Sequence, residues 1–432
     1  MQLANEQMNQ VSAPIRRVSE ADTTESFATS GPREGIVDAA TASRIAVLTG
    51  GGDRPYALGL AAALISQGVA FDFVGSDELN DPLLRQSKLV RFLNLRKDMR
   101  SNVSAAKKVM RVLLYYWRLL LYAASAKPRL FHILWNNKFA ILDRTLLMLY
   151  YRALGKRIVL TVHNVNAGQR DGNDNSLNRL TLWIQYTLAD HIFVHTEQMR
   201  KGMQAEFQVG ESKVTVIPFG LNSTVPNTSL TGREARQHLG LVESDKVVLF
   251  FGNIAPYKGL EYLLDAMVIL ARKSGDYRLL IAGQPKNCEP YWEEIKRWLS
   301  NPALRSCVIQ HIEYVPDADT EIYFKAADVL ALPYLHIFQS GVLFLGYNFG
   351  LPVIASDVGS LRDDVVESRT GFMCKARDPI DLAKGIETYF SSELYGQLAA
   401  RRREIRDFSS KKYSWTKVGE TTRAVYADLL GK

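Results

Sequence analysis

A turn of three glycines, Gly50 to Gly52, separates a β-branched apolar run from a stretch of helical composition. Glycine has no Cβ, so the backbone at Gly51 and Gly52 can come close to a diphosphate or a sugar, beside the free amides of the next helix. The pattern is not a GxGxxG dinucleotide motif, because the third glycine is missing and Asp72 lies inside the following strand. A plain tight turn between strand and helix is the open alternative.

A second candidate phosphate site contains Lys258. This lysine follows the buried-strand run at residues 246–254 and, with Gly259, is expected to begin a helix. Free amides and the helix dipole attract anions at such a position, and the lysine adds a full positive charge. We therefore expect Lys258 to meet a phosphate group.

A polar loop after the strand run at residues 157–164 supplies groups that can transfer protons. Its side chains are those of His163, Asn164, Arg170, Asp171 and Asp174. His163 is a predicted catalytic residue, and Asp171, or Asp174 in its place, is expected to take the proton of an acceptor hydroxyl if the reaction inverts. A structural histidine and an Asx-rich turn are the alternatives. The loop lacks the later Gly and Glu of an EF-hand, so it predicts no calcium site.

The three candidate segments each follow a predicted strand, so they can form one site only if the fold brings the ends of these strands together. Buried-strand runs alternate with helical stretches in two cycles, which favours parallel sheets covered on both faces. The runs lie at residues 44–50, 69–75, 131–136, 157–164 and 191–196, then at 246–254, 277–283, 308–315, 328–334 and 351–356. Ligands of such sheets bind at the carboxyl ends of the strands. The sequence predicts an α/β protein with two tandem Rossmann-like domains and an interdomain cleft.

Four segments follow from this pattern. Residues 1–40 lack the apolar core of a signal peptide and are rich in Ser, Thr, Glu and Gln, so they are expected to form a disordered tail. Turn formers at residues 218–236 divide the rest into an acceptor domain, 41–225, and a donor domain, 226–410. Residues 411–432 are expected to be helical, with a return to the first domain left open.

The two cycles resemble the family 4 glycosyltransferases of the GT-B fold. Part of the resemblance lies in a buried strand followed by the pattern xxxKG, which ends in Lys258 and Gly259. The block at residues 327–365 has the spacing of the family's signature. The resemblance implies a nucleotide diphosphate sugar whose diphosphate is held by the backbone amides of Gln339, Ser340, Gly341 and Val342. A helix N-terminus there is an anion site on physical grounds too. A simple helix capped by Ser340 is the alternative.

The resemblance also assigns supporting residues. Gly283 and Gln284 would approach the nucleotide, and a strand at residues 313–315 would hold the base by its backbone. The expected cleft lining comprises Asn164, Arg170, Thr196, Phe219 and Gly220.

Three positions depart from the family pattern. Asn253 stands where the family usually has an arginine, so Lys258 is left as the carried-over phosphate-binding cation. Ile337 and Leu345 stand where the family has two glutamates. Gln339 and His336 could supply polar contacts instead. The donor and the stereochemical outcome, usually retention in the family, therefore stay open.

Net charge and cysteine usage limit the classes of partner and the cellular location that the sequence predicts. The formal net charge of +8 suits nucleic acid, anionic lipid or phosphorylated substrates, but no nucleic-acid motif accompanies it, so no nucleic-acid partner is predicted. Cys288, Cys307 and Cys374 form no CxxC pair, which favours a reducing, cytoplasmic location without a zinc site. No metal or other cofactor is expected.

A basic and aromatic stretch at residues 88–129 has two interpretations. It is too interrupted to span a bilayer, but as a helix it could lie at an anionic membrane surface through Lys107, Lys108, Arg111 and Arg118, on the cytoplasmic face. Alternatively, the helix packs its apolar face on the first sheet and turns its basic face to solvent.

The leading functional hypothesis is transfer of a hexosyl group to a glycan or lipid-linked acceptor during envelope or exopolysaccharide synthesis. A sugar-nucleotide 2-epimerase shares the architecture, and the apolar Ile337 and Leu345 also permit a catalytically inactive binding module.

Overall fold

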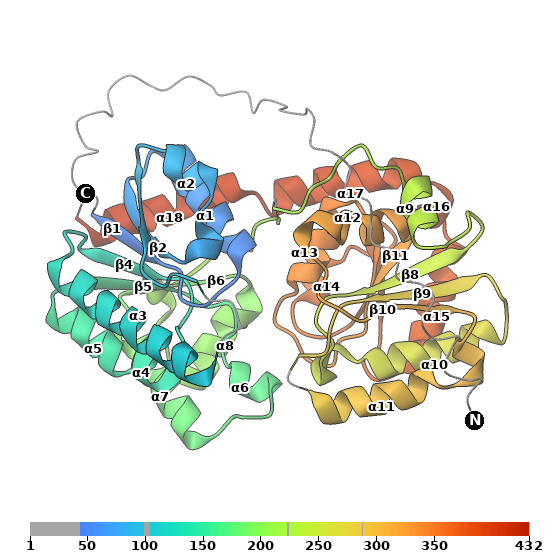
Figure 1. The fold of residues 1–432 in the computed structure, drawn as a ribbon. Helices are drawn as coiled ribbons and strands as arrows, with labels where there is room; N and C mark the ends of the chain where they lie inside the picture. The colour runs from blue at the N-terminus through green and yellow to red at the C-terminus, as the bar shows by residue number, and fades with distance from the viewer. Residues whose placement is uncertain (1–43, 99–103, 223, 287, 432) are drawn as a thin grey trace. The chain divides into compact units, whose positions relative to one another are not determined.

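The computed structural model describes residues 44–98, 104–222, 224–286 and 288–431 of the 432-residue chain (Figure 1). The predicted disordered tail at residues 1–40 lies outside the described residues.

The first half of the chain forms a seven-stranded parallel sheet of order β3-β2-β1-β4-β5-β6-β7. Its strands are β1 (Ile45–Leu48), β2 (Phe71–Gly75), β3 (Val90–Asn94), β4 (Leu130–Ile133), β5 (Arg157–Thr161), β6 (His191–Val194) and β7 (Val214–Val216). Nearly every residue of β1, β2, β4, β5 and β6 is buried. Apolar runs without polar alternation are what a sheet covered on both faces requires.

Helices cover both faces of this sheet. They are α1 (Arg54–Ser66), α2 (Pro82–Gln86), α3 (Ala105–Ser125), α4 (Ala140–Arg144), α5 (Leu146–Ala153), α6 (Ala167–Arg170), α7 (Ser176–Leu188), α8 (Glu197–Phe207) and α18 (Trp415–Leu429). Helices α1 and α18 share one core, and α3, α5, α7 and α8 share another. A Cβ on Gly59 would come within 2.2 Å of the Trp415 ring, so glycine there lets α18 pack tightly on α1. The chain's last helix therefore lies on the first sheet.

The second half forms a six-stranded parallel sheet of order β10-β9-β8-β11-β12-β13. Its strands are β8 (Lys246–Phe251), β9 (Tyr277–Ala282), β10 (Val308–His311), β11 (Val329–Leu332), β12 (Val353–Ser356) and β13 (Gly371–Cys374). Its helices are α9 (Gly232–His238), α10 (Leu260–Ala271), α11 (Glu289–Leu299), α12 (Asp317–Ala326), α13 (Gly341–Asn348), α14 (Leu361–Asp364), α15 (Pro379–Phe390), α16 (Glu393–Gly396) and α17 (Leu398–Lys412). Two cores cover its two faces. The predicted fold class, two tandem Rossmann-like domains, is confirmed.

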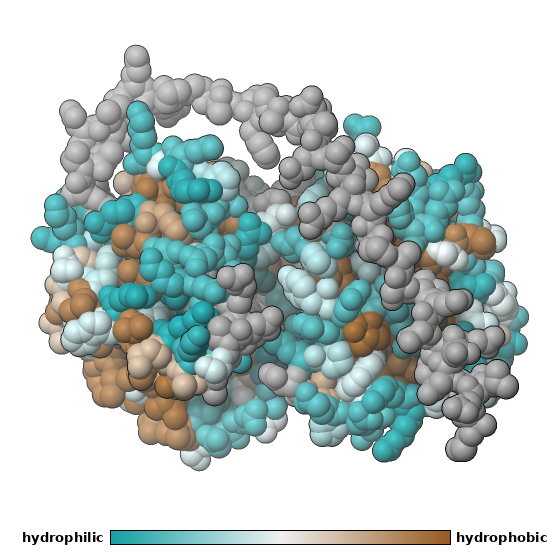
Figure 2. Space-filling model, viewed as in Figure 1, coloured by the Kyte–Doolittle hydropathy of each residue, from teal (hydrophilic) through white to brown (hydrophobic). Residues whose placement is uncertain are grey.

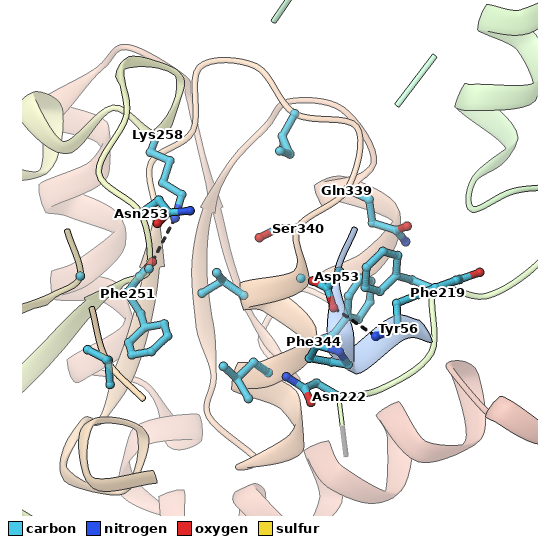
Figure 3. A pocket seen from close by; sticks show the side chains of 18 of the residues that line it. Asp53, Tyr56, Phe219, Asn222, Phe251, Asn253, Lys258, Gln339, Ser340 and Phe344 are labelled. Carbon is cyan, nitrogen blue, oxygen red and sulfur yellow. Dashed lines mark hydrogen bonds between the residues drawn. The ribbon is translucent and has the colours of Figure 1, made fainter. Parts of the chain in front are cut away.

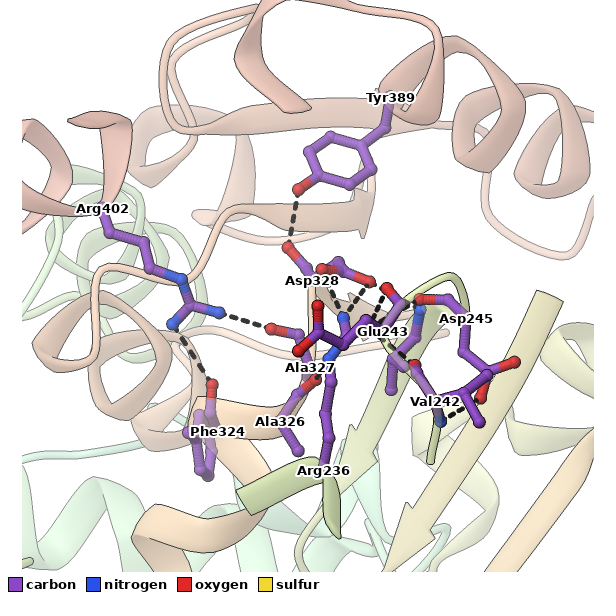
Figure 4. A network of polar contacts seen from close by, with 11 residues as sticks. Arg236, Val242, Glu243, Asp245, Phe324, Ala326, Ala327, Asp328, Tyr389 and Arg402 are labelled. Carbon is purple, nitrogen blue, oxygen red and sulfur yellow. Dashed lines mark hydrogen bonds and ion pairs between the residues drawn. The ribbon is translucent and has the colours of Figure 1, made fainter. Parts of the chain in front are cut away.

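A buried polar network fastens the amino ends of β8 and β11 (Figure 4). Arg236 of α9 donates to both carboxylate oxygens of Asp328 at 2.8 Å, and the Val247 amide donates to the same carboxylate at 2.8 Å. Tyr389 donates to the Asp328 carbonyl at 2.6 Å. The strands are parallel, so this network lies at the sheet edge opposite the carboxyl ends, where ligands of such sheets bind. Its role is structural.

Two sequence predictions about elements were wrong. The stretch at residues 88–129 is not one helix, because β3 occupies Val90–Asn94 as an edge strand and α3 begins only at Ala105. The expected strand at residues 313–315 is a loop, because β10 ends at His311 and Pro316 precedes the first turn of α12. Strands β7 and β13 were not predicted. The expected domain boundary near residue 225 falls between β7 and β8.

Candidate active site

Each sheet has one point where the strand order reverses, between β1 and β4 in the first and between β8 and β11 in the second. Doubly wound sheets bind ligands at the carboxyl ends of the strands at this point, because the adjacent connections run to opposite faces and leave a crevice. The loops at these ends hold Gly51, Trp135, Lys258 and Ser340. Two cavities lie there.

The cleft cavity has a volume of about 380 Å³ and is lined by residues of both halves of the chain (Figure 3). It gathers eight of the predicted donor-binding residues, namely Asn253, Lys258, Gly283, Gln284, Gln339, Ser340, Gly341 and Val342. Arg170, Phe219 and Gly220, predicted as cleft lining, also border it. Residues that are far apart in sequence thus form one wall.

Lys258 is buried, with only 4% of its surface exposed. It ends a 3-10 turn, Pro256–Lys258, rather than beginning a helix, and α10 starts two residues later. Its Nζ donates to the Phe251 carbonyl at 3.1 Å, and burial lowers its pKa to about 7. An ammonium group with so little compensation is poised to gain from an anion.

The N-terminus of α13 is the second feature of the cleft cavity that can attract an anion. Ser340 is its N-cap, and the Ser340 hydroxyl accepts from the Leu343 amide at 3.4 Å and lies 3.2 Å from the Tyr334 hydroxyl. The amides of Gly341 and Val342, at the start of the helix, have no intrahelical partner, and both residues border the cavity. The expected alternative, a capped helix, therefore coexists with free amides that can bind an anion.

Two glycines of the cleft cavity, Gly252 and Gly283, stand where the backbones of neighbouring strand ends come too close for a Cβ. Gly252 and Gly283 have φ of 87° and 147°, and a Cβ on Gly283 would lie 2.1 Å from the Gly252 carbonyl oxygen. A Cβ on Gly252 would lie 3.1 Å from the Nζ of Lys258. These glycines keep the carboxyl ends of β8 and β9 together and leave room for the lysine.

The first-domain cavity has a volume of about 500 Å³ and is lined mostly by residues before β7. Of the predicted site residues it gathers Gly51, His163, Asn164, Arg170 and Gln339. Asp53 and Arg170 border both cavities, so the two cavities adjoin at these residues.

His163 is held on three sides in the wall of the first-domain cavity. Its ring stacks on Trp135 with centroids 4.2 Å apart and planes 3° from parallel, and Tyr56 meets it edge-on at 4.7 Å. His195 Nε2 lies 3.0 Å from His163 Nδ1. His163 Nε2 is buried without a hydrogen-bond partner among the described residues. Burial, and then His195, keep the pKa of His163 well below its usual range.

The predicted residues Gly52, Thr196, Asp171 and Asp174 lie outside the linings of both cavities. A Cβ on Gly52 would lie 1.8 Å from the Trp135 ring, so Gly52 positions that ring. Thr196 caps α8 by accepting from the Met199 amide at 3.1 Å. Asp171 pairs with Arg170 at 2.7 Å, and Asp174 pairs with Arg179 at 2.6 Å.

The three positions that depart from the family pattern all border the cleft cavity, whereas the polar residues expected to compensate for them are divided between cavities. Ile337 and Leu345 border the cleft cavity, together with the apolar Phe219 and Phe344. His336, expected to replace a lost polar contact, borders a third cavity beside Tyr257 and Trp298. Gln339 borders both main cavities, and its Oε1 is buried without a partner among the described residues.

Sequence reasoning did not single out Asp53, Tyr56, Trp135 or Trp415, which border the cavities. Asp53 is the N-cap of α1, and its side chain accepts from the Tyr56 amide at 3.1 Å. Burial, and then Asp317, raise the pKa of the Asp53 carboxyl although the residue is exposed to solvent in the cavity wall. Trp135 lies two residues after the end of β4, so the rule that strand ends face the crevice would have found it.

The described part of the chain contains no group of three or more His, Cys, Asp or Glu side chains that could hold a metal ion.

Residues 50–225 match the family described as Glycosyltransferase Family 4, and residues 245–392 match Glycosyl transferases group 1. The chain belongs to the family 4 glycosyltransferases. The two matches cover the second sheet and strands β2 to β7 of the first, and they confirm the resemblance inferred from the sequence.

Individual relatives of this glycosyltransferase are distant. The D-inositol 3-phosphate glycosyltransferase of Corynebacterium glutamicum is 23% identical over 56% of this chain and 58% of that protein. The aligned region thus spans little more than half of that relative.

Solved structures agree with the fold. Sucrose-phosphate synthase from Thermosynechococcus elongatus has a TM-score of 0.69 at 18% identity, covering 90% of this chain and 99% of that one. Anabaena HepE in complex with UDP-glucose has a TM-score of 0.67 at 16% identity, covering 89% and 99%. These neighbours support the GT-B fold.

Proposed function

We propose that this glycosyltransferase moves a hexosyl group from a nucleoside diphosphate sugar to a hydroxyl of a glycan or lipid-linked acceptor. The observation that carries the proposal is the convergence of Lys258 and the α13 N-terminus on one wall of the cleft cavity. The Anabaena neighbour's complex with UDP-glucose supports a donor of this class.

In the proposed reaction, the bond between the anomeric carbon and the diphosphate oxygen breaks, and a bond to the acceptor oxygen forms. Negative charge develops on the departing diphosphate. The amides of Gly341 and Val342 and the ammonium of Lys258 would stabilise it in a site of low dielectric. The proposal assigns no role to a metal or another cofactor.

The acceptor would occupy the first-domain cavity. His163 Nε2, which is buried there and finds no hydrogen-bond partner within the described ranges, would bond a sugar or acceptor hydroxyl. In an inverting reaction the hydroxyl proton needs a base. Asp53 is the carboxylate that borders both cavities, whereas Asp171 borders neither and is held by Arg170. We therefore propose Asp53 in the role that the sequence suggested for Asp171.

We further propose that the reaction takes place in the cytoplasm and serves envelope or exopolysaccharide synthesis. All three cysteines are buried and unbridged, as a reducing compartment favours. The neighbour WaaG, a glycosyltransferase involved in lipopolysaccharide biosynthesis, has a TM-score of 0.59 at 16% identity.

Turnover of a nucleotide-sugar panel tests this function. The protein is incubated with each donor, with and without saccharide acceptors, and release of nucleoside diphosphate and the fate of the sugar are measured. Acceptor-dependent release with a new glycoside is the expected result. Free epimer without acceptor would indicate the epimerase, and donor binding without turnover would indicate the inactive module that Ile337 and Leu345 permit.

A further inference from the structure

One face of the first domain carries a layer of exposed apolar side chains. Brown side chains gather at the lower left of Figure 2, over the helices α3, α4 and α5 of Figure 1. The apolar layer comprises Val109, Met110, Leu113, Leu114, Trp117, Leu121, Phe139, Ile141, Leu146, Leu149, Leu154, Leu177, Leu180 and Trp183. Among the described residues, the other exposed large hydrophobic side chains are Leu83, Val242, Tyr314 and Ile380. Soluble surfaces rarely concentrate apolar side chains in this way without a partner.

The four helices that carry the layer are neighbours. Helices α4, α5 and α7 contact one another. Tyr116 of α3 stacks on Phe139 at 5.6 Å, and Tyr150 of α5 donates to the Leu120 carbonyl of α3 at 3.0 Å. The exposed side chains therefore belong to one surface.

Helix α3 is apolar on two faces. Tyr115, Tyr116, Leu119 and Ala123 are buried in the core of the first sheet. On another face Trp117 is 60% exposed, next to further exposed leucines. Helix α3 thus packs on the first sheet, as the packed-helix interpretation expected, but its solvent face also carries apolar side chains that this interpretation did not predict. In the described part of the chain, no helix is long and apolar enough to cross a bilayer.

The charge of these helices is strongly one-sided. Helices α3, α4, α5 and α7 contain seven lysine or arginine residues and one carboxylate, Asp143, which is buried. Lys107 and Lys108 are exposed, whereas Arg111 pairs with Asp98 at 3.4 Å and Arg118 donates to the Leu95 carbonyl at 3.3 Å. An apolar face among basic residues matches an anionic bilayer. Arg152 and Arg179 pair with Asp190 and Asp174, so the exposed positive charge of these helices rests mainly on Lys107 and Lys108.

Two of these helices also line the first-domain cavity. Arg144 of α4 and Gln185 and Tyr186 of α7 border it, while Ile141 and Trp183 of the same helices are exposed in the apolar layer. A helix is about 10 Å across with its side chains. The cavity thus lies about one helix diameter behind the layer.

We propose that the apolar layer docks the protein on an anionic lipid bilayer. Leucine and tryptophan side chains insert between the lipids, and Lys107 and Lys108 meet the headgroups. Docking would hold the first-domain cavity close to a bilayer that contains a lipid-linked acceptor. The biological role of docking therefore rests on the proposed function. Insertion of apolar side chains, unlike purely electrostatic attachment, persists in salt.

Vesicle co-sedimentation tests the proposal. The probes are vesicles of phosphatidylcholine alone and of phosphatidylcholine with phosphatidylglycerol, in 0.1 M and 1 M salt (about 10 Å and 3 Å Debye length). The test variant carries Leu113→Gln, Trp117→Gln and Leu121→Gln on α3. The matched control carries Leu83→Gln, Val242→Gln and Ile380→Gln, which are equally apolar and exposed but lie outside the layer.

The parent and the control are expected to bind anionic vesicles and to lose less than tenfold of their partitioning in high salt. The test variant should partition at least tenfold more weakly. Circular dichroism shows whether each variant is folded. Equal binding by parent and test variant, or no binding by a folded parent, would overturn the proposal. So would a dimer of the parent that only the test variant loses, since a second copy would then cover the layer.

Vesicle binding needs no nucleotide sugar, so it is independent of the proposed reaction. A parent that turns over soluble substrates but ignores vesicles contradicts the docking alone. A parent that binds vesicles but turns over no donor contradicts the transferase alone.

Discussion

His195 fixes which nitrogen of His163 carries a hydrogen. His195 Nδ1 lies 3.3 Å from the Ile217 carbonyl oxygen, which can only accept, so Nδ1 carries the hydrogen. In neutral His195, Nε2 is then an acceptor, and the hydrogen in its 3.0 Å contact belongs to His163 Nδ1. His163 Nε2 is left with a lone pair, ready to accept from a substrate hydroxyl.

Substitutions of the two histidines should therefore separate binding from transfer. His163→Ala should leave donor Kd within about twofold but lower kcat by about 10²-fold, because the substrate hydroxyl loses the acceptor that positions it. His195→Phe should lower kcat by about tenfold, because His163 Nδ1 loses its acceptor. His195→Gln should restore much of the rate, since its amide can donate to Ile217 and accept from His163.

The pH dependence provides a second check on this pair. Burial lowers the pKa of His195 to about 4 and keeps that of His163 well below its usual range. Both rings should thus be neutral at pH 7, and neither should give an inflection in kcat near 6.5, the ordinary pKa of a histidine. Unfolding of His163→Ala, seen by circular dichroism, would instead assign that ring to the core.

Lys258 should make donor binding dependent on pH. Its pKa of about 7 in the folded protein will rise when a diphosphate binds beside it, so a proton is taken up on binding above pH 7. Donor Kd should increase with pH by up to about tenfold per unit. Isothermal titration calorimetry at pH 7, 8 and 9 measures this. Lys258→Met should bind weakly and with a flat profile, and a parent with a flat profile would remove Lys258 from the phosphate site.

The same lysine should reduce stability. The unfolded state holds the Lys258 proton up to about pH 10, whereas the folded state releases it near 7, so this residue makes the free energy of unfolding rise with pH across that window. Lys258→Met should remove the dependence and stabilise the ligand-free protein at pH 7 by about 1 to 4 kcal/mol.

The fold, and the meeting of Lys258 and Ser340 at the cleft cavity, could be predicted because their sequence signals are local. Apolar runs bounded by glycine, the Lys258-Gly259 pair and the Ser340 cap each determine their own turn, and parallel topology brings the strand ends together. Burial was not predictable in the same way. Helix α3 has apolar side chains on two faces, and periodicity cannot tell which face packs on the sheet. Asp53 was missed because its capping role is visible in the sequence and its shared position between two cavities is not.

A proline at Gly341 should remove one anion-binding amide and leave the helix intact. Gly341 is the first residue of α13, where proline is tolerated, and Ser340 has the extended backbone (φ −117°, ψ 113°) that a residue before proline needs. A Cβ at Gly341 would meet only Phe219, at 4.0 Å, so Gly341→Ala is the matched control. Loss of one charge-assisted hydrogen bond, about 1.5 to 3 kcal/mol, should weaken donor binding about tenfold to hundredfold in the proline variant alone. Tight binding by a folded Gly341→Pro variant would place the diphosphate elsewhere.

Two carboxylates compete for the role of base, and asparagine variants should distinguish them. Asp53→Asn keeps the N-cap of α1, since asparagine caps as well as aspartate, but removes the charge that borders both cavities. It should lower kcat by about 10²-fold with little change in Tm, whereas Asp171→Asn, which only releases Arg170, should stay within about threefold. Because the pKa of Asp53 is raised, the parent should lose activity as acid protonates this carboxyl, and that acid limb should vanish in Asp53→Asn. If Asp171→Asn proves the slower variant, the polar loop must close over the acceptor during turnover. If both variants keep the parental rate, neither carboxylate takes the proton, and this result would favour retention, in which the departing diphosphate can accept it.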